Sequence, residues 1–177
     1  NIYGTINILE AMRFNKVKRI IYTASASCYG IPKKIPTTEE DKIDLQYPYA
    51  FTKFIGEQSV THWSKVYGIE YISLRLFNVY GLRSRTSGAY GAVMGVFLKQ
   101  KLSNKALTVV GNGKQSRDFV NVKDVCRAFV MASKTKKINK IINIGSSKPV
   151  KVISLAKMIS SKVTFIPKRP GEPDISM

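Results

Sequence analysis

The sequence predicts an open α/β fold, in which helices cover both faces of a mostly parallel sheet. Two observations predict it: strand-like and helix-like segments alternate along the 177 residues, and no repeat or low-complexity segment interrupts them. Such alternation is typical of parallel strands joined by crossover helices. With 44% hydrophobic and 23% charged residues, the chain has a globular composition and enough length for one core and a small second lobe.

The individual elements follow from hydrophobic periodicity along the chain. The first is a helix over residues 1–14, in which Ile2, Ile6, Leu9 and Met12 form one stripe. The others are expected to be a strand at 18–24, a helix at 48–66, a strand at 69–77, a helix at 92–102, strands at 107–110 and 117–122, a helix at 122–133, a strand at 140–145, a helix at 152–160 and a strand at 162–167.

Glycines mark two of the boundaries. Gly68 is expected to end the helix at 48–66. The segment GNGKQS at 111–116 begins like a dinucleotide-binding fingerprint, but it lacks the third glycine and leads into a strand. A phosphate-binding turn must instead open a helix whose amides face the phosphate. We therefore interpret GNGKQS as an ordinary turn.

The two ends of the sequence look cut. It opens inside a helical pattern without an initiator Met, and it closes on PGEPDISM with no element after the last predicted strand. We therefore interpret the chain as a fragment of a longer protein, and we expect any glycine-rich βα turn to lie outside it. On this interpretation the fragment alone is expected to be inactive.

Charge and composition limit the function classes. The formal net charge is +18, from 29 Lys and Arg against 11 Asp and Glu, which would suit a polyanion. The basic residues are scattered without a recognition motif, however, so no nucleic acid partner is expected. No apolar run or leader pattern predicts membrane insertion. Two distant cysteines and one histidine predict neither a disulfide framework nor a metal site, and a cytoplasmic protein is expected.

The strongest chemical pattern lies between residues 22 and 53. Tyr49 and Lys53 stand four residues apart near the start of a predicted helix, so they share one face. A neighbouring ammonium favours phenolate and is expected to lower the pKa of Tyr49, which makes it a candidate acid or base. Ser25 follows a predicted strand, where open α/β sheets bind ligands. An isolated Tyr-x-x-x-Lys is common, but this order of strand, small hydroxyl residues and Tyr-x-x-x-Lys is more specific.

Further motifs turn this pattern into a family resemblance. The segments NIYGTINILEAMRFNKVKRIIYTASASCYG, YPYAFTK, LRLFNVYG, LTVVGNGKQSRDFVNVKDV, NIG and RPGEP follow one another in order. With them the chain resembles the extended short-chain dehydrogenase/reductase family, specifically its nucleotide-sugar epimerases and dehydratases. The resemblance implies the C-terminal part of a Rossmann-type, doubly wound parallel sheet with a smaller α/β substrate-binding lobe. Residues 1–81 and 123–147 would belong to the NAD-binding domain, 82–122 to a substrate-binding segment and 148–177 to the start of the C-terminal lobe.

The resemblance also implies roles for individual residues. Tyr49 would be the catalytic acid/base, Lys53 would bind the nicotinamide ribose and lower the pKa of Tyr49, and Ser25 would be the catalytic hydroxyl residue. The NAD contacts implied are Tyr49, Lys53, Ala24 and Phe77. The substrate contacts implied are Ser25, Ser27, Asn78, Tyr90, Ala92, Val93, Arg117, Arg169, Glu172 and Ser176.

Within the substrate set, each residue type suits its implied role. Arg117 and Arg169 would clamp the diphosphate, a task for which planar, bidentate guanidinium groups are suited. Glu172 would accept from the nucleotide ribose, and Ser176 would lie beside the C2 substituent of the sugar, where a small residue admits an N-acetyl group. Without the resemblance, Arg117 could equally be a surface partner of Asp118.

The implied activity is NAD-dependent epimerisation of a UDP-sugar at C4, through transient hydride abstraction and a 4-keto intermediate. The related 4,6-dehydratases carry an Asp-Glu pair where this chain has Ala26 and Ser27. A UDP-uronate epimerase, a 4,6-dehydratase and a dehydrogenase that releases NADH stay as enzymatic alternatives. A noncatalytic nucleotide-sugar or polyanion-binding protein is the alternative of another class. The resemblance implies a homodimer for the whole protein. His62, Trp63 and the cysteines are expected in packing or surface roles.

Overall fold

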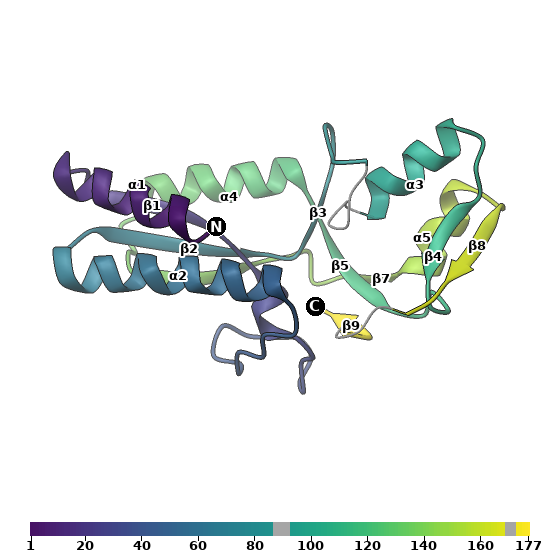
Figure 1. Cartoon of the computed structure of the whole chain (residues 1–177), viewed down its shortest axis with the longest axis horizontal. Coiled ribbons are helices and arrows are strands. Elements are labelled where there is room, and N and C mark those ends of the chain that lie inside the picture. The colour runs from purple at the N-terminus through teal and green to yellow at the C-terminus, as the bar shows by residue number, and fades with distance from the viewer. Residues whose placement is uncertain (87–92, 169–172) are drawn as a thin grey trace. The chain divides into compact units, whose positions relative to one another are not determined.

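The computed structural model describes residues 1–86, 93–168 and 173–177 (Figure 1). These residues form two compact units, each made from separate stretches of chain. The first unit comprises Asn1–Gly30, Thr38–Leu76 and Cys126–Ile144. The second comprises Ile31–Thr37, Phe77–Val125 and Gly145–Met177.

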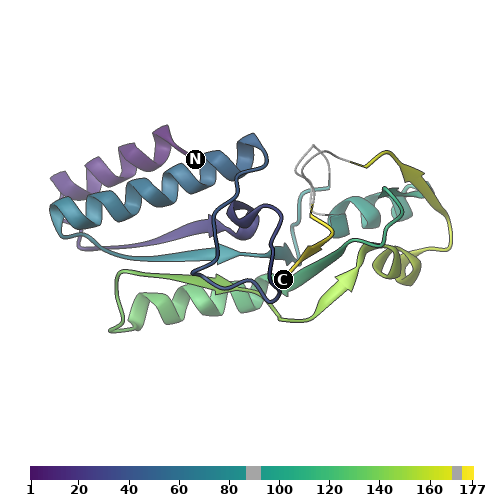
Figure 2. The same ribbon diagram turned by 90° about the horizontal axis from the view of Figure 1, so that it is seen from below.

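The first unit is built on a three-stranded parallel sheet with the order β1-β2-β6. Its strands are β1 (Arg19–Ser25), β2 (Glu70–Leu76) and β6 (Lys140–Ile144). Its helices are α1 (Tyr3–Phe14), α2 (Pro48–Tyr67) and α4 (Val122–Lys134), together with a short 3-10 helix, Ala26–Tyr29, that directly continues β1. Figure 2 shows α1 and α2 on one face of these strands and α4 on the other.

Both faces of this sheet bury apolar side chains, as expected for a parallel sheet covered by helices. On the face of α1 and α2, the packed cluster consists of Leu9, Tyr22, Ala24 and Val60. On the face of α4, it consists of Ile72, Leu74 and Ala132. The helical stripe predicted for the first segment therefore turns toward the sheet, with Leu9 and Met12 buried.

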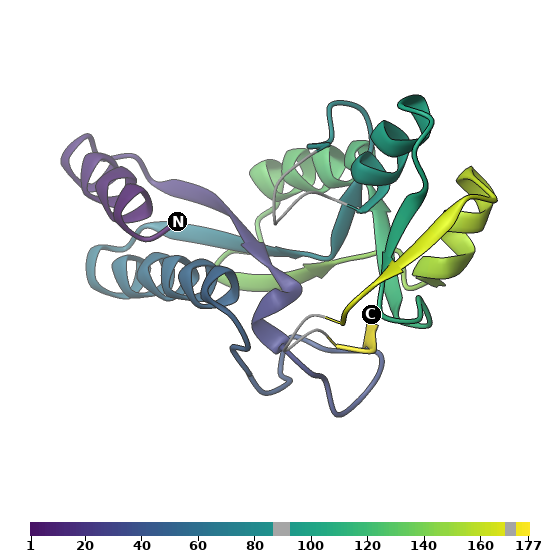
Figure 3. The ribbon, with the colours of Figure 1, turned by 45° about the vertical axis from the view of Figure 1, so that its right-hand side comes forward.

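The second unit has shorter strands, several of which meet at β5. Its strands are β3 (Asn78–Tyr80), β4 (Leu107–Val110), β5 (Ser116–Asn121), β7 (Pro149–Lys151), β8 (Val163–Ile166) and β9 (Ile175–Ser176). β5 pairs with β3 and β9 in parallel and with β7 in antiparallel orientation, whereas β4 pairs with β8. Helices α3 (Val93–Leu102) and α5 (Val152–Ile159) lie beside β4 and β8 (Figure 3). The core between them consists of Phe97, Leu107, Val109, Val152, Leu155 and Ala156.

The predicted α/β class is confirmed, and so is each predicted helix and strand, with some changes at the boundaries. The strand expected at 69–77 ends at Leu76, and Asn78–Tyr80 forms a separate strand in another sheet. The GNGKQS turn is confirmed, since Gly111 and Gly113 adopt φ of 59° and 70° between β4 and β5. One expectation was wrong: β9 does follow the last predicted strand. Over the described residues, no helix is both long and apolar enough to cross a bilayer.

Candidate active site

Ser25 lies where β1 ends and the 3-10 helix begins. It is the N-cap of that helix, and its Oγ accepts a hydrogen bond of 3.2 Å from the amide of Ser27. A serine at this position is well suited to start a turn, because its hydroxyl satisfies an amide that lacks a partner within the helix. The side chain therefore stands at the carboxyl edge of the parallel sheet, which is the ligand-binding edge in open α/β folds.

The next hydroxyl along the turn belongs to Ser27. Its Oγ is buried and has no hydrogen-bond partner within the described part of the chain. A buried polar atom left unbonded costs about 1–3 kcal/mol, so native structures rarely keep one without a functional reason. A polar group of a ligand at this edge of the sheet would satisfy it. Among the described residues, Ser27 therefore gives the clearest indication that a ligand binds at this edge, because its buried hydroxyl needs a hydrogen-bond partner.

Tyr49 and Lys53 lie in the first turns of α2, on one face of the helix. The helix begins at Pro48, whose ring favours the first helical position. The ammonium of Lys53 donates to the carbonyl of Thr23 at 2.8 Å and lies 5.6 Å from the ring centroid of Tyr22. Because Thr23 precedes Ser25 on β1, this bond ties the start of α2 to the strand end that carries Ser25. Burial lowers the pKa of Lys53 below its ordinary value.

The residues of this edge fit a nicotinamide nucleotide. A lysine ammonium has three donors, and Thr23 accepts one of them, so the group can serve the vicinal hydroxyls of a ribose as well. Ala24, a further predicted NAD contact in this unit, is buried in β1. Its small side chain lies among the residues that pack β1 against α2.

Three of the predicted substrate residues of the second unit lie on β5 and the strands beside it. Arg117 is buried in this strand, and its Nη1 donates to the carbonyl of Ser116 at 2.9 Å. Ser176, on β9, is the register partner of Arg117, so the two side chains share a face of the sheet. Asn78 begins β3 and pairs with Phe119 of β5.

The remaining predicted residues, the NAD contact Phe77 and the other substrate contacts, are placed as follows. Phe77 lies between β2 and β3, and Val93 is the first residue of α3. Tyr90, Ala92, Arg169 and Glu172 lie outside the described residues.

The alternative of a surface pair between Arg117 and Asp118 is wrong. Asp118 is only 2% exposed, and its carboxylate accepts hydrogen bonds from the amides of Ser146 and Ser147 and from the Ser146 hydroxyl. A side chain at Gly145 would collide with this carboxylate. Asp118 therefore fixes the turn after β6, a role that the sequence did not indicate.

Sequence reasoning also missed a buried ion pair between Glu57 and Arg75, in which Nη2 of Arg75 lies 2.6 Å from Oε1 of Glu57. One signal was present, since Glu57 lies eight residues after Tyr49 and so falls on the same helical face. Arg75 gave a second signal, as a charge within the apolar run YISLRLF.

Known proteins are similar to this chain in sequence and in fold. Residues 1–145 match the NAD dependent epimerase/dehydratase family. The chain is 39% identical to a putative UDP-glucose 4-epimerase of Methanocaldococcus jannaschii, over 93% of this chain and 53% of that protein. It matches the whole of its length to 59% of the UDP-N-acetylglucosamine 4-epimerase from Methanobrevibacter ruminantium M1 in complex with UDP-N-acetylmuramic acid, with a TM-score of 0.93 and 28% identity.

A third similarity is to the UDP-glucuronic acid 4-epimerase from Bacillus cereus, solved in complex with UDP-glucuronic acid and NAD. It has a TM-score of 0.88 and 33% identity, over 97% of this chain and 56% of that one. The chain spans about half the length of the curated relatives it matches. The resemblance seen in the motifs is confirmed: the chain belongs to the NAD dependent epimerase/dehydratase family.

Proposed function

We propose that the whole protein epimerises a UDP-sugar at C4, with NAD as its cofactor, through a 4-keto intermediate. Family membership supports the class of reaction, and several relatives are named as UDP-sugar 4-epimerases. The single observation that carries the proposal is the bond from Lys53 to Thr23. It joins the first turns of α2, which carry Tyr49, to β1, which ends at Ser25. An acid–base reaction on a sugar hydroxyl needs these two groups close together.

In this mechanism, the residues of the first unit handle the proton. The phenolic oxygen of Tyr49 takes the proton of the sugar 4-hydroxyl, and the hydroxyl of Ser25 donates to the same sugar oxygen. Lys53 supplies a positive charge one helical turn away, which favours the phenolate during the transfer. NAD, held by Tyr49, Lys53, Ala24 and Phe77, would supply the acceptor for the hydride of C4 and the donor for its return to the other face. Tyr49 then gives the proton back, so the residues end the cycle as they began it.

The second unit is proposed to hold the nucleotide. Arg117 has the chemistry for the diphosphate, because a guanidinium offers paired donors to phosphate oxygens. Its burial in β5 limits the conformations of the side chain and so favours a defined contact. The proposal keeps the other implied contacts, namely Asn78, Tyr90, Ala92, Val93, Arg169, Glu172 and Ser176.

The turn after β1 favours epimerisation over dehydration. Eliminating water requires an additional acid and base near the sugar, and the 4,6-dehydratases carry these at the positions of Ala26 and Ser27. In this chain Ala26 is a buried alanine and Ser27 is a hydroxyl residue. Neither residue exchanges protons near neutral pH, so the elimination step lacks its catalysts.

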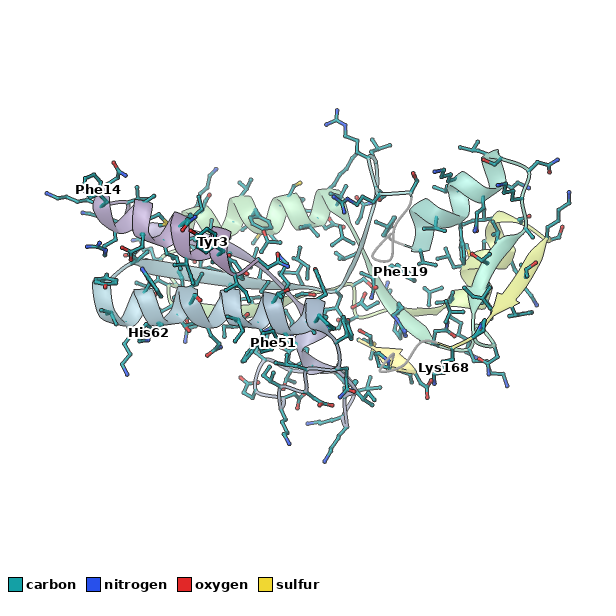
Figure 4. All side chains as sticks on the ribbon, in the orientation of Figure 1. Tyr3, Phe14, Phe51, His62, Phe119 and Lys168 are labelled. Carbon is teal, nitrogen blue, oxygen red and sulfur yellow. The ribbon has the colours of Figure 1, made fainter. Side chains whose placement is uncertain are left out.

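The proposal is tested by assaying the whole protein for interconversion of UDP-glucose and UDP-galactose. Tyr49→Phe keeps the ring and removes the ionisable oxygen, so kcat should fall by about 10²–10⁴-fold. Ser25→Ala should also lower kcat. The matched control is His62→Ala, on the same helix, because His62 is exposed (Figure 4). A Tyr49→Phe variant with wild-type turnover would contradict the catalytic assignment.

A UDP-uronate is the second candidate substrate, favoured by the 33% identity to the UDP-glucuronic acid 4-epimerase. The assay therefore includes UDP-glucuronic acid beside UDP-glucose and UDP-N-acetylglucosamine. A higher kcat/KM for the uronate would reassign the substrate and leave the mechanism intact. Tight binding of all three sugars without turnover would instead support a noncatalytic binding protein.

A cytoplasmic homodimer is proposed as the working form. Large apolar side chains stand exposed on the first unit, including Tyr3 at 79%, Phe14 at 82% and Phe51 at 49% (Figure 4). They come from α1 and α2, and exposed apolar patches of this kind commonly mark protein interfaces. Light scattering of the whole protein in solution should give twice the monomer mass, and a monomer at micromolar concentration would contradict the proposal.

A further inference from the structure

A buried hydrogen-bond network in the first unit is centred on Arg75. Arg75, on β2, is 3% exposed, and Glu57, on α2, is 1% exposed. Two nitrogens of the guanidinium bind the Glu57 carboxylate, with Nη2 2.6 Å from Oε1 and Nε 3.1 Å from Oε2. The third nitrogen, Nη1, donates to the hydroxyl of Tyr29 at 2.8 Å. One guanidinium thus joins a strand, a helix and the 3-10 helix.

The network extends to the far strand of the sheet. The Tyr29 hydroxyl donates to the side-chain Oδ1 of Asn143 on β6 at 2.8 Å. The backbone N–H of Asn143 donates to Oε1 of Glu39 at 2.6 Å. On the other side, the Ser73 hydroxyl donates to Oε2 of Glu57 at 2.7 Å. We call these side chains the Arg75 network; they are Tyr29, Glu39, Glu57, Ser73, Arg75 and Asn143.

The Arg75 network touches each element that carries a proposed catalytic group. Glu57 lies one helical turn beyond Lys53 and two turns beyond Tyr49, on the same face of α2. Tyr29 ends the 3-10 helix of which Ser25 is the N-cap. Through Glu57 and Tyr29, the guanidinium of Arg75 therefore joins the helix that carries Tyr49 to the 3-10 helix that Ser25 caps.

Stability alone does not account for this network. Replacing a buried ion pair with apolar residues of similar volume is often neutral or stabilising, because burying the charges is costly. The guanidinium fixes the relative orientation of the groups that it bonds, since its planar fork of N–H donors holds several acceptors at fixed angles. Burial by itself would lower the pKa of Arg75, but its hydrogen bonds to Glu57 and Tyr29 raise that pKa overall, so the group stays a cation. Burial also raises the pKa of Tyr29, which keeps its hydroxyl proton for Asn143.

We propose that Arg75 and Tyr29 are positioning residues for the reaction: they fix α2, at Glu57 in its middle, against the 3-10 helix after β1, and so set the geometry between Tyr49 and Ser25. The inference rests on the proposed function, because it concerns the same acid–base pair. A misplacement of about 1 Å in a catalytic group can cost roughly 10²-fold in rate. Loosening the network should therefore slow the chemical step while leaving the binding of the nucleotide sugar nearly unchanged.

Two variants of the whole protein test this inference. Arg75→Lys keeps the charge but cannot hold Glu57 and Tyr29 at once, so kcat should fall by about 10²-fold. Tyr29→Phe keeps the ring and breaks only the link from Arg75 to Asn143, with an expected loss of about 10-fold. In both variants, KM for the UDP-sugar should stay within about 3-fold of wild type, as expected when an interaction acts in the transition state.

The matched control is Arg19→Lys. Arg19, on β1, has its Nη2 2.7 Å from Oε2 of Glu70, on β2, at the end of these strands opposite to Ser25 and Arg75. It also donates to the carbonyls of Ser133 and Thr135. This variant breaks a similar set of bonds far along the strands from Ser25, so its kcat should stay within about 2-fold of wild type.

A second readout separates positioning from loss of folded protein. A sugar deuterated at C4 should show a larger isotope effect on kcat in Tyr29→Phe than in wild type, because the chemical step becomes more rate-limiting. Partial unfolding would lower kcat without changing the isotope effect. If wild type and Arg19→Lys are active and Tyr29→Phe matches them in both readouts, the inference is overturned and the proposed function stands. If wild type turns over none of the UDP-sugars, the proposed function fails and takes the inference with it.

Discussion

The two units bury their charges in different ways. In the first unit, Arg75 and Glu57 neutralise each other inside the core, and a tyrosine and an asparagine extend the network. In the second unit, the carboxylate of Asp118 is held by backbone amides and a hydroxyl of the turn at Ser146. The first arrangement fixes side chains on three different elements, whereas the second fixes one turn.

This difference matches the tasks that we propose for the two units. Moving a proton between Tyr49 and a sugar hydroxyl tolerates little misplacement, so the supporting groups need defined directions. Binding a diphosphate needs hydrogen-bond donors and positive charge, and several residues can share this task. We therefore expect changes in the first unit to act mainly on kcat, and changes in the second unit to act mainly on KM and substrate choice.

The largest effect is expected on breaking the buried pair of the first unit. Glu57→Leu leaves the Arg75 charge buried without its partner, which should lower the free energy of unfolding by about 3–5 kcal/mol. Urea unfolding followed by the fluorescence of Trp63 measures this, because Trp63 is the sole tryptophan and lies on α2 in the same unit.

The matched change in the second unit is Asp118→Asn. It keeps the shape of the side chain and weakens the bonds to the turn at Ser146, so the expected loss is smaller, at about 1–3 kcal/mol. Adding Arg75→Met to Glu57→Leu should restore much of the stability, because it removes the unpaired charge. Equal losses for Glu57→Leu and Asp118→Asn would contradict the contrast between the units.

The long elements and the local motif could be predicted from the sequence. β1, β2 and α2 carry strong periodic patterns, and the position of Tyr49 and Lys53 on one helical face depends only on a spacing of four within α2. Both features depend on neighbours in sequence, so no knowledge of the tertiary fold was needed. The same holds for the turn at Gly111 and Gly113, whose residue types specify it.

The supporting contacts could not be predicted in the same way. Glu57 and Arg75 are 18 residues apart, and Asp118 and Ser146 are 28 apart, so only the folded chain brings them together. β7 and β9 have three and two residues, which is too short for a period to emerge. The helical pattern would place Phe51 among the buried residues, but its side chain is 49% exposed because its face of α2 does not meet the sheet.

A smaller effect, on substrate choice, is expected in the second unit. Ser176 shares a sheet face with Arg117, so a larger side chain there would fill space beside the proposed diphosphate contact. Wild type should turn over both UDP-glucose and UDP-N-acetylglucosamine, and Ser176→Tyr should selectively lose the latter, since overfilling a site costs about 1–3 kcal/mol. The measurement is kcat/KM for both sugars in both proteins. Ser176→Thr, with one added methyl group, is the matched control, and an unchanged ratio in Ser176→Tyr would remove this residue from the specificity argument.

The smallest effect is a pH dependence of the stability of the first unit. Burial raises the pKa of the Cys28 thiol to about 12, with Arg75 partly opposing the shift, whereas a thiol in the unfolded chain titrates near its ordinary pKa of 9.0. Above pH 9, the ordinary pKa of a thiol, the unfolded chain therefore binds fewer protons than the folded one at this site. The contribution of Cys28 is fully present below pH 9 and is lost as the pH rises toward 12.

The slope of the free energy of unfolding against pH, compared between wild type and Cys28→Ala, separates this thiol from the other groups that titrate at alkaline pH. Between pH 9 and 10, the free energy of unfolding of wild type should fall more steeply than that of Cys28→Ala, by at most about 1.4 kcal/mol per pH unit. Lys53, whose lowered pKa acts in the opposite direction, is common to both proteins and cancels in the difference. Cys126→Ala, at an exposed position on α4, should keep the wild-type slope. Parallel slopes for wild type and Cys28→Ala, followed by Trp63 fluorescence, would mean that the thiol already ionises in the folded unit and that water reaches this part of the core.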